Sequence, residues 1–295
     1  INKKILLINI ESESELILIN KISKKLGKCT NIGIRLNPNI SVSTHKKITT
    51  GIYSSKFGIS NESFNKIIKK IDNYKNINLV AISVHIGSQI NNIKPFLKLI
   101  SIVDKTIKKN NLKLKYIDLG GGIGVPYIKN EKKLNLAKYA KQISKFLKKY
   151  NCKIILEPGR LISANTAVLI SKIIYIKNIK SKKLIILDAG MNDFMRPALY
   201  DAKHHIFPIK NSNKKFNSPV EFVGPVCESS DKFLKVNNFT KLNENDYVCI
   251  ADVGAYGSVL SSNYNLRPFI AEVLINGSKF NIIRKRQSLK DLLKQ

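Results

Sequence analysis

The sequence predicts an α/β protein in which a parallel sheet covered by helices, either doubly wound or closed as a barrel, is followed by an antiparallel β-sheet domain. Up to about residue 165, short apolar runs alternate with amphipathic helical patterns, as in sheets whose two faces are both covered by helices. From about residue 166, short apolar runs are separated by turn signals. We therefore expect two domains, residues 1–165 and residues 166–295.

The first part repeats a strand and a helix along the chain. The strand-like runs are residues 4–10, 31–38, 79–87, 115–122 and 152–159, and the helical patterns between them are residues 14–27, 63–74, 94–110 and 135–150. These five strands are fewer than the eight that close a barrel. The chain also begins with Ile1 instead of Met, inside a structured element. We therefore expect a further segment before residue 1, and a barrel that is N-terminally incomplete in this sequence.

The second part contains apolar runs with turn signals between them. These runs are residues 167–178, 182–190, 218–227, 245–254 and 269–286. Within the last run, Asn276-Gly277 lies between two alternating strands and predicts a hairpin with a type I′ turn. Residues 288–295 are expected to form a closing helix.

The charge of the chain is strongly positive. Lys and Arg number 51 against 20 Asp and Glu, which gives a net charge of +31, and by itself this would suggest a nucleic-acid or membrane partner. The lysines are scattered over helix faces and loops, however, with no basic arm or aromatic-interleaved RNA motif. The charge therefore predicts no specific nucleic-acid partner.

The cysteines and the apolar runs indicate where the protein works. The chain contains four cysteines, Cys29, Cys152, Cys227 and Cys249, with no C-x-x-C pair. This pattern is typical of a reducing compartment and does not predict a disulfide framework or a metal site. No apolar run approaches the roughly 18 residues that span a bilayer, and "ESESE" stands where a signal-peptide cleavage site would be. We expect a cytoplasmic protein without a membrane partner.

Three consecutive glycines, Gly120, Gly121 and Gly122, follow a strand-like run in "DLGGGIGVPY". Each glycine costs backbone entropy, so three in a row suggest that the backbone must approach something closely. Bare N–H groups at the start of a helix would suit a phosphate. A plain tight turn is the alternative, because the motif is neither a Walker A loop nor a dinucleotide fingerprint.

Polar residues also end the neighbouring strands. His85 ends one strand in "VHIGSQ", and Glu157, Gly159 and Arg160 end another in "LEPGR". A buried structural histidine is the alternative for His85. Together with the glycines, these residues suit a phosphorylated heteroaromatic cofactor, because a ring can stack on the imidazole while a carboxylate binds a protonated ring nitrogen.

Further candidates lie in the second part. Cys227 and Glu228 are adjacent at a strand-to-loop corner, and Tyr256 lies between alanine and glycine. A small buried thiol beside a surface carboxylate is the alternative for the pair. Arg196 precedes a proline in an otherwise apolar loop that also carries Tyr200, a better place for a carboxylate clamp than for a solvated charge.

Six motifs, in order, resemble the diaminopimelate decarboxylase family of pyridoxal-phosphate enzymes. They are "HIGSQI", "DLGGGIGVPY", "EPGRLISANTAVLI", "DAGMNDFMRPALYDAKHHI", "GPVCESSDKF" and "GAYGSVLSSNYN". The resemblance implies a TIM-type (β/α) barrel followed by a β domain. It also implies a head-to-tail homodimer with two shared active sites, and conversion of meso-2,6-diaminopimelate to L-lysine and CO2.

The resemblance further implies which residues bind pyridoxal 5′-phosphate. His85 would stack on the ring and Glu157 would bond its nitrogen. The other implied cofactor-binding residues are Ser88, Gly121, Gly122, Pro158, Gly159, Arg160 and Tyr256.

The implied substrate residues lie mostly in the second part. Cys227 would be the catalytic proton donor, entering from the partner subunit together with Glu228, which would bind the distal ammonium. The other implied substrate-binding residues are Arg160, Arg196, Tyr200 and Tyr256.

One family element, the Schiff-base lysine, has no counterpart in this sequence and is expected before residue 1. Two alternatives therefore stand beside the diaminopimelate reaction. One is a related decarboxylase of ornithine, arginine or carboxynorspermidine, and the other is a non-catalytic remnant that binds the cofactor without turnover. "CESSD" with Glu228 and "MRPALYD" with Arg196 favour diaminopimelate, because a second amino-acid head needs both a carboxylate and an arginine.

Overall fold

The computed structural model describes residues 1–3, 5–42, 51, 55–210 and 212–294. By their contacts the residues form two compact units, one of residues 1–125 with 132–161 and one of residues 126–131 with 162–295. Each unit has its own hydrophobic core. Residues 126–131, which follow the glycine motif, are grouped with the second unit.

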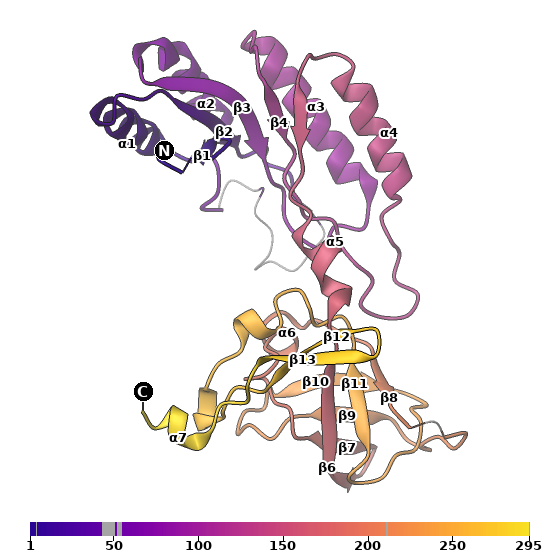
Figure 1. The fold of residues 1–295 in the computed structure, drawn as a ribbon. Helices are drawn as coiled ribbons and strands as arrows, with labels where there is room; N and C mark the ends of the chain where they lie inside the picture. Colours follow the sequence, from indigo (N-terminus) through magenta and orange to yellow (C-terminus); the bar gives the residue numbers. More distant parts are fainter. Residues whose placement is uncertain (4, 43–50, 52–54, 211, 295) are drawn as a thin grey trace. The chain divides into compact units, whose positions relative to one another are not determined.

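The first unit is a parallel sheet of five strands in the order β1-β2-β3-β4-β5. The strands are Ile8–Ile10, Thr30–Leu36, Ile77–Val84, Tyr116–Asp118 and Lys153–Ile155. The helices between them are α1 (Glu13–Lys25), α2 (Asn61–Lys70, followed by a 3₁₀ turn, Ile71–Asn73), α3 (Ile93–Lys109) and α4 (Leu136–Leu147). The predicted alternation of strand and helix is confirmed (Figure 1), although the first residue of the predicted strand 4–10 lies outside the described residues.

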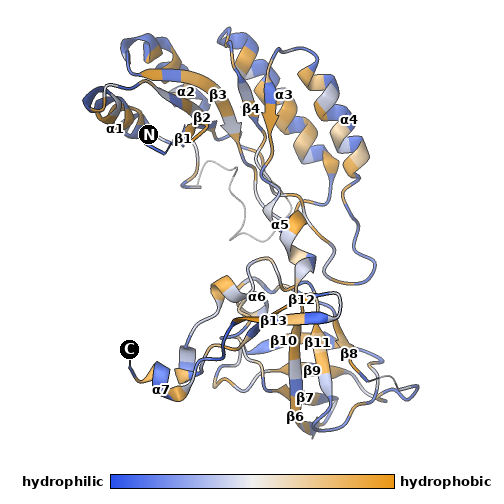
Figure 2. Ribbon diagram, in the orientation of Figure 1, coloured by the Kyte–Doolittle hydropathy of each residue, from blue (hydrophilic) through white to orange (hydrophobic). Residues whose placement is uncertain are grey.

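Local sequence explains where these helices begin. The side chains of Ser12, Ser60, Asn92 and Asn135 each accept a hydrogen bond from a backbone N–H in the first turn of the helix that follows, which supplies an orphan donor with a partner. The helices then bury one apolar face: Phe64 and Phe96 are almost fully buried in the core with the strand residues. Figure 2 shows the two-sided colouring of α3 and α4.

The expectation that a helix starts at the three glycines is wrong. Strand β4 ends at Asp118, and α4 begins only at Leu136. Gly120 and Gly122 have positive φ values of 64° and 91°, and Pro126 disfavours helix at the residue before it. The glycines therefore open a long loop, whereas the short helix α5 (Gly159–Ser163) follows β5 closely.

The second unit contains a six-stranded sheet in the order β10-β9-β7-β6-β11-β8. Its strands are β6 (Leu169–Ile179), β7 (Lys182–Leu187), β8 (Ile206–Pro208), β9 (Val220–Val223), β10 (Lys232–Val236) and β11 (Tyr247–Ile250). The pairs are antiparallel as predicted, except that β7 and β9 are parallel. The long connection through α6 (Arg196–Tyr200) and β8 makes this crossover possible.

A separate hairpin of β12 (Glu272–Asn276) and β13 (Lys279–Arg284) follows. The hairpin was predicted correctly, but its turn type was not. Asn276 pairs with Lys279, so the turn residues are Gly277 and Ser278, and of these two only Gly277 has a positive φ. A glycine at the first turn position is the type II′ arrangement.

The chain closes with a short helix, α7 (Leu289–Leu292), which begins at a capping box of Ser288 and Asp291. Residue 295 of the predicted closing helix lies outside the described residues. None of the helices in the described residues combines the length and the apolarity that crossing a membrane requires.

Candidate active site

Three strand ends of the first unit bring the predicted cofactor residues together. His85 follows β3, the glycines follow β4, and Glu157 follows β5, and in a parallel sheet these ends share one edge. The Gly121 N–H donates to Nδ1 of His85 (3.1 Å), and the Glu157 N–H donates to the Gly120 carbonyl (2.8 Å). Hydrogen bonds therefore join all three segments.

The close approach of neighbouring backbone explains the glycines. A Cβ at Gly120, Gly121 or Gly122 would lie 2.4, 2.0 or 2.1 Å from the carbonyl oxygen of Val84, Glu157 or Gly87, respectively. None of these distances leaves room for a side chain. The three glycines are thus required by the packing of neighbouring backbone, independently of any phosphate that their N–H groups would hold.

Replacing Gly122 by alanine is expected to lower the free energy of unfolding by about 2–5 kcal/mol, because a positive φ is strained for alanine and the Cβ overlaps the Gly87 carbonyl. Gly159→Ala is the matched control, since no atom lies within 4 Å of its Cβ position. Its expected change is below about 1 kcal/mol. Urea unfolding measures the free energy of unfolding of both variants. Equal unfolding midpoints for Gly122→Ala and Gly159→Ala would contradict the claim that the Gly87 carbonyl leaves no room for a side chain at Gly122.

His85 is held as a neutral ring. Because Nδ1 accepts the Gly121 N–H, the proton of the neutral imidazole is on Nε2. Burial lowers the pKa of His85, and the charge of Arg35 lowers it further, against an opposing effect of Asp118. A half-buried, uncharged flat ring suits stacking on another aromatic ring.

Asp118 is a residue that was not selected from the sequence. Its side chain is 1% exposed and accepts hydrogen bonds from the Gly120 N–H (2.9 Å), Ser83 Oγ (2.9 Å) and Asn9 Nδ2 (3.1 Å). These bonds connect the glycine loop to β3 and β1. The available signal was its position, the last strand residue before the glycine motif.

Glu157 lies at the end of β5 with its side chain partly open to solvent. Partial loss of solvation raises the pKa of Glu157, and the nearby charge of Asp118 raises it further, while Arg35 lowers it. Arg35, at the carboxyl end of β2, was also missed; it forms an ion pair with Glu11 (2.5 Å). One arginine thus acts on both His85 and Glu157.

Arg160 and Ser88 meet at the same edge. Arg160 is the second residue of α5 and is 7% exposed. Its Nη2 and Nε donate to Ser88 Oγ at 2.9 and 3.3 Å. Pro158 lies between Glu157 and this helix, and the Gly159 N–H donates to the Glu157 carbonyl (2.9 Å). The "EPGR" segment therefore reaches back to the residues that follow β3.

In the second unit, Arg196 begins α6, which also carries the half-buried Tyr200. Arg196 is 4% exposed, and its Nη1 lies 3.1 Å from His204 Nε2. Its guanidinium lies over the ring of Tyr127, 4.6 Å from the centroid. Neither His204 nor Tyr127 was selected from the sequence.

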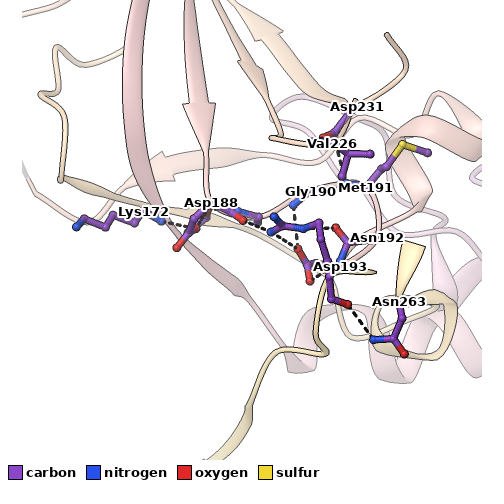
Figure 3. A network of polar contacts seen from close by, with 12 residues as sticks. Lys172, Asp188, Gly190, Met191, Asn192, Asp193, Val226, Asp231 and Asn263 are labelled. Atoms are coloured by element: carbon purple, nitrogen blue, oxygen red, sulfur yellow. Dashed lines mark hydrogen bonds and ion pairs between the residues drawn. The ribbon is translucent and has the colours of Figure 1, made fainter. Parts of the chain in front are cut away.

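Cys227 and Glu228 are exposed on a loop whose geometry depends on the buried Asp231. The Asp231 carboxylate accepts the N–H groups of Val226 and Met191, both at 2.7 Å. Figure 3 shows this contact within a wider polar network. The loop of Cys227 is thereby fixed to the loop that leads into α6.

An arginine extends the same network. Arg267 donates to Asn192 Oδ1 (2.9 Å) and to the Asp188 carbonyl, and its own carbonyl accepts from Asn263. In the loop that carries Cys227, Glu228 accepts a hydrogen bond from the hydroxyl of Tyr264, and this bond raises the pKa of Tyr264.

Tyr256 has a left-handed backbone, with φ of 58°, and a side chain that is 47% exposed. Bulky residues rarely adopt this conformation, and such outliers cluster at functional sites. Among the described residues, no group of three or more His, Cys, Asp or Glu side chains is arranged to hold a metal ion.

Comparisons with known proteins show which family the chain resembles. Residues 1–164 match the family model described as the pyridoxal-dependent decarboxylase, pyridoxal binding domain. Diaminopimelate decarboxylase from Zymomonas mobilis is 39% identical over 290 residues, which cover 97% of this chain and 68% of that protein.

Solved structures extend the likeness to the fold. The diaminopimelate decarboxylase of Helicobacter pylori in complex with L-lysine superposes with a TM-score of 0.89 at 41% identity, over 98% of this chain and 73% of that one. The enzyme of M. jannaschii gives a TM-score of 0.91 at 37% identity, over 100% and 70%. The predicted fold class, barrel followed by β domain, is confirmed. The chain belongs to the pyridoxal-dependent decarboxylases and, among them, to the diaminopimelate decarboxylase family.

Proposed function

We propose that the protein is a pyridoxal-phosphate-dependent decarboxylase that converts meso-2,6-diaminopimelate to L-lysine and CO2. The observation that carries the proposal is the set of groups at one sheet edge: a neutral His85, the close-packed glycines and the Glu157 carboxylate. The family to which the chain belongs uses this cofactor and carries out this reaction.

The residues present fit pyridoxal phosphate. The flat, uncharged ring of His85 can stack on a pyridine without adding charge, and Glu157 can accept a hydrogen bond from its protonated nitrogen. Ser88, Gly122 and Arg160 supply hydroxyl, backbone and guanidinium donors suited to a phosphate. Gly121, whose N–H donates to His85, would contribute to the phosphate site by the close approach of its backbone. Pro158, Gly159 and Tyr256 complete the proposed lining.

When bound, the cofactor supplies an electron sink for the carbon that loses CO2. The chain's own residues do the rest. Glu157 keeps the proton on the ring nitrogen, and Arg196 orients a substrate carboxylate with Tyr200. Cys227 gives its thiol proton to the carbon that CO2 has left. The C–C bond to CO2 and the thiol S–H bond are broken, a C–H bond is formed, and solvent returns a proton to the thiolate. Glu228 binds the ammonium of the L-centre, and Arg160 also reaches the substrate.

We also propose that the protein is a homodimer in which Cys227 and Glu228 complete the partner's site. Apart from Tyr256, the proposed cofactor residues belong to the first unit, whereas Cys227 and Glu228 belong to the second. The two predicted domains, residues 1–165 and 166–295, would then have separate tasks. We also propose that the protein is cytoplasmic, because none of its four cysteines forms a disulfide in the structure.

A substrate panel tests the proposed function. With pyridoxal phosphate present, the protein purified from its full reading frame is expected to release CO2 from meso-2,6-diaminopimelate with formation of L-lysine, and far more slowly from ornithine, arginine or carboxynorspermidine. A preference for one of the latter would identify a related decarboxylase. Cofactor binding, followed by absorbance, without CO2 from any substrate would identify a non-catalytic remnant.

A further inference from the structure

A buried aromatic cluster surrounds Arg196 in the second unit. Tyr127 is 5% exposed and His204 1% exposed, and their ring centroids lie 4.3 Å apart. Phe194 meets His204 edge-on, with centroids 4.7 Å apart. Arg196 lies against this cluster through the Tyr127 ring and His204 Nε2. A guanidinium placed in this way has few orientations open to it.

The two contacts of the His204 ring nitrogens determine its protonation. Nδ1 lies 2.9 Å from the carbonyl oxygen of Ala251, which can only accept, so Nδ1 carries the hydrogen. Nε2 lies 3.1 Å from Nη1 of Arg196, which can only donate, so Nε2 carries a lone pair. Both requirements are met only by the neutral Nδ1–H tautomer. A doubly protonated ring would turn an N–H towards a guanidinium of the same charge.

Tyr127 holds the other side of the guanidinium and is itself fixed by its backbone. Its N–H donates to Glu131 Oε2 (2.7 Å), and its carbonyl accepts the His205 N–H (2.8 Å). His205 in turn accepts the Ala251 N–H through its carbonyl (2.9 Å). The backbone of His205 therefore bonds both to Tyr127, whose ring faces the guanidinium, and to Ala251, whose carbonyl accepts from His204 Nδ1.

We propose that His204 is a positioning residue for the substrate arginine: as the neutral Nδ1–H tautomer it accepts a hydrogen bond from Arg196 and fixes the guanidinium on the Tyr127 face. The orientation of the guanidinium is thereby set before substrate arrives. This inference rests on the proposed role of Arg196 in the decarboxylase reaction. In this scheme His204 acts through Arg196, so it affects substrate binding and not the proton transfer by Cys227.

The tautomer is tested first, because it does not depend on activity. A long-range ¹H–¹⁵N correlation spectrum of histidine-labelled protein at neutral pH is expected to contain one ring with a protonated Nδ1 and an unprotonated Nε2. That signal should disappear in His204→Gln and remain in His205→Gln, a control in which the exposed neighbouring side chain is changed. An Nε2–H tautomer or a doubly protonated ring at position 204 would overturn the proposal.

Kinetics of two amide variants then test the positioning. Glutamine can place its oxygen near the position of Nε2 and keep the acceptor for Arg196, whereas asparagine reaches only the Nδ1 side and keeps the bond to Ala251. His204→Asn is expected to raise KM for meso-2,6-diaminopimelate about 10–100-fold with kcat changed less than about threefold. His204→Gln should restore most of the loss, with cofactor absorbance unchanged in both.

Equal KM values for the Asn and Gln variants, or a loss confined to kcat, would overturn the proposal. A histidine with a merely structural role would not give a higher KM in His204→Asn than in His204→Gln with kcat nearly unchanged. If the wild-type protein decarboxylates no substrate, the proposed function fails, and the decision on His204 rests on its tautomer alone.

Discussion

Replacing Glu157 by glutamine is expected to lower kcat for decarboxylation by about 10²–10³-fold, the effect typical of losing one electrostatic stabiliser of a transition state. An amide has no charge with which to keep a proton on the ring nitrogen. The variant should fold normally, because the contact between β5 and the glycine loop uses the backbone N–H of Glu157. Steady-state rates, with cofactor content measured by absorbance, provide the check.

The pH profile gives the same variant a second signature. Because partial burial and Asp118 raise the pKa of Glu157, its carboxylate is protonated, and activity is lost, at a higher pH than for an ordinary glutamate. This acid limb should be absent from Glu157→Gln. Glu62→Gln is the matched control, an exposed glutamate paired with Lys66 on α2, and should leave rate and profile unchanged. A wild-type rate for Glu157→Gln would remove this residue from the reaction.

Replacing Cys227 by alanine is expected to lower kcat by about 10²–10⁴-fold, the range typical of a lost general acid. KM should change little, because Arg196 and Glu228 are left in place. The loop should keep its shape, since its anchors are the Val226 and Met191 N–H groups on Asp231, and not the thiol. Cys29→Ala, which removes an exposed thiol of the first unit, is the control and should behave as wild type.

Mixing the two inactive variants tests whether sites are shared. In a dimer formed from one Cys227→Ala chain and one Glu157→Gln chain, one site would carry both changes and the other neither. Random exchange gives heterodimers in about half of the molecules, so about a quarter of the wild-type activity should return. If the mixture stays as inactive as its components, Cys227 and Glu157 serve one site from the same chain.

The alternation of strands and helices in the first unit could be predicted from the amino-acid sequence, apart from the short helix α5, and so could the places where chemistry could lie. Burial determines the spacing of apolar residues along the chain. Strands covered on both faces are apolar throughout, whereas helices such as α3 have apolar residues at the helical period, on the one face that is buried. The ends of the strands can be predicted as well, because polar residues such as His85 and Glu157 interrupt an apolar run. The motifs around these residues are distinctive enough to indicate the family by themselves.

The contacts that those residues make could be learned only from the three-dimensional structure. The three glycines are required by the carbonyls of Val84, Glu157 and Gly87, which belong to neighbouring segments, and no local pattern states which backbones will meet. Asp118 and His204 were missed for the same reason: each is defined by hydrogen bonds to residues far along the chain. Periodicity records whether a side chain is buried, whereas the partner of a buried polar group is set by how distant segments pack.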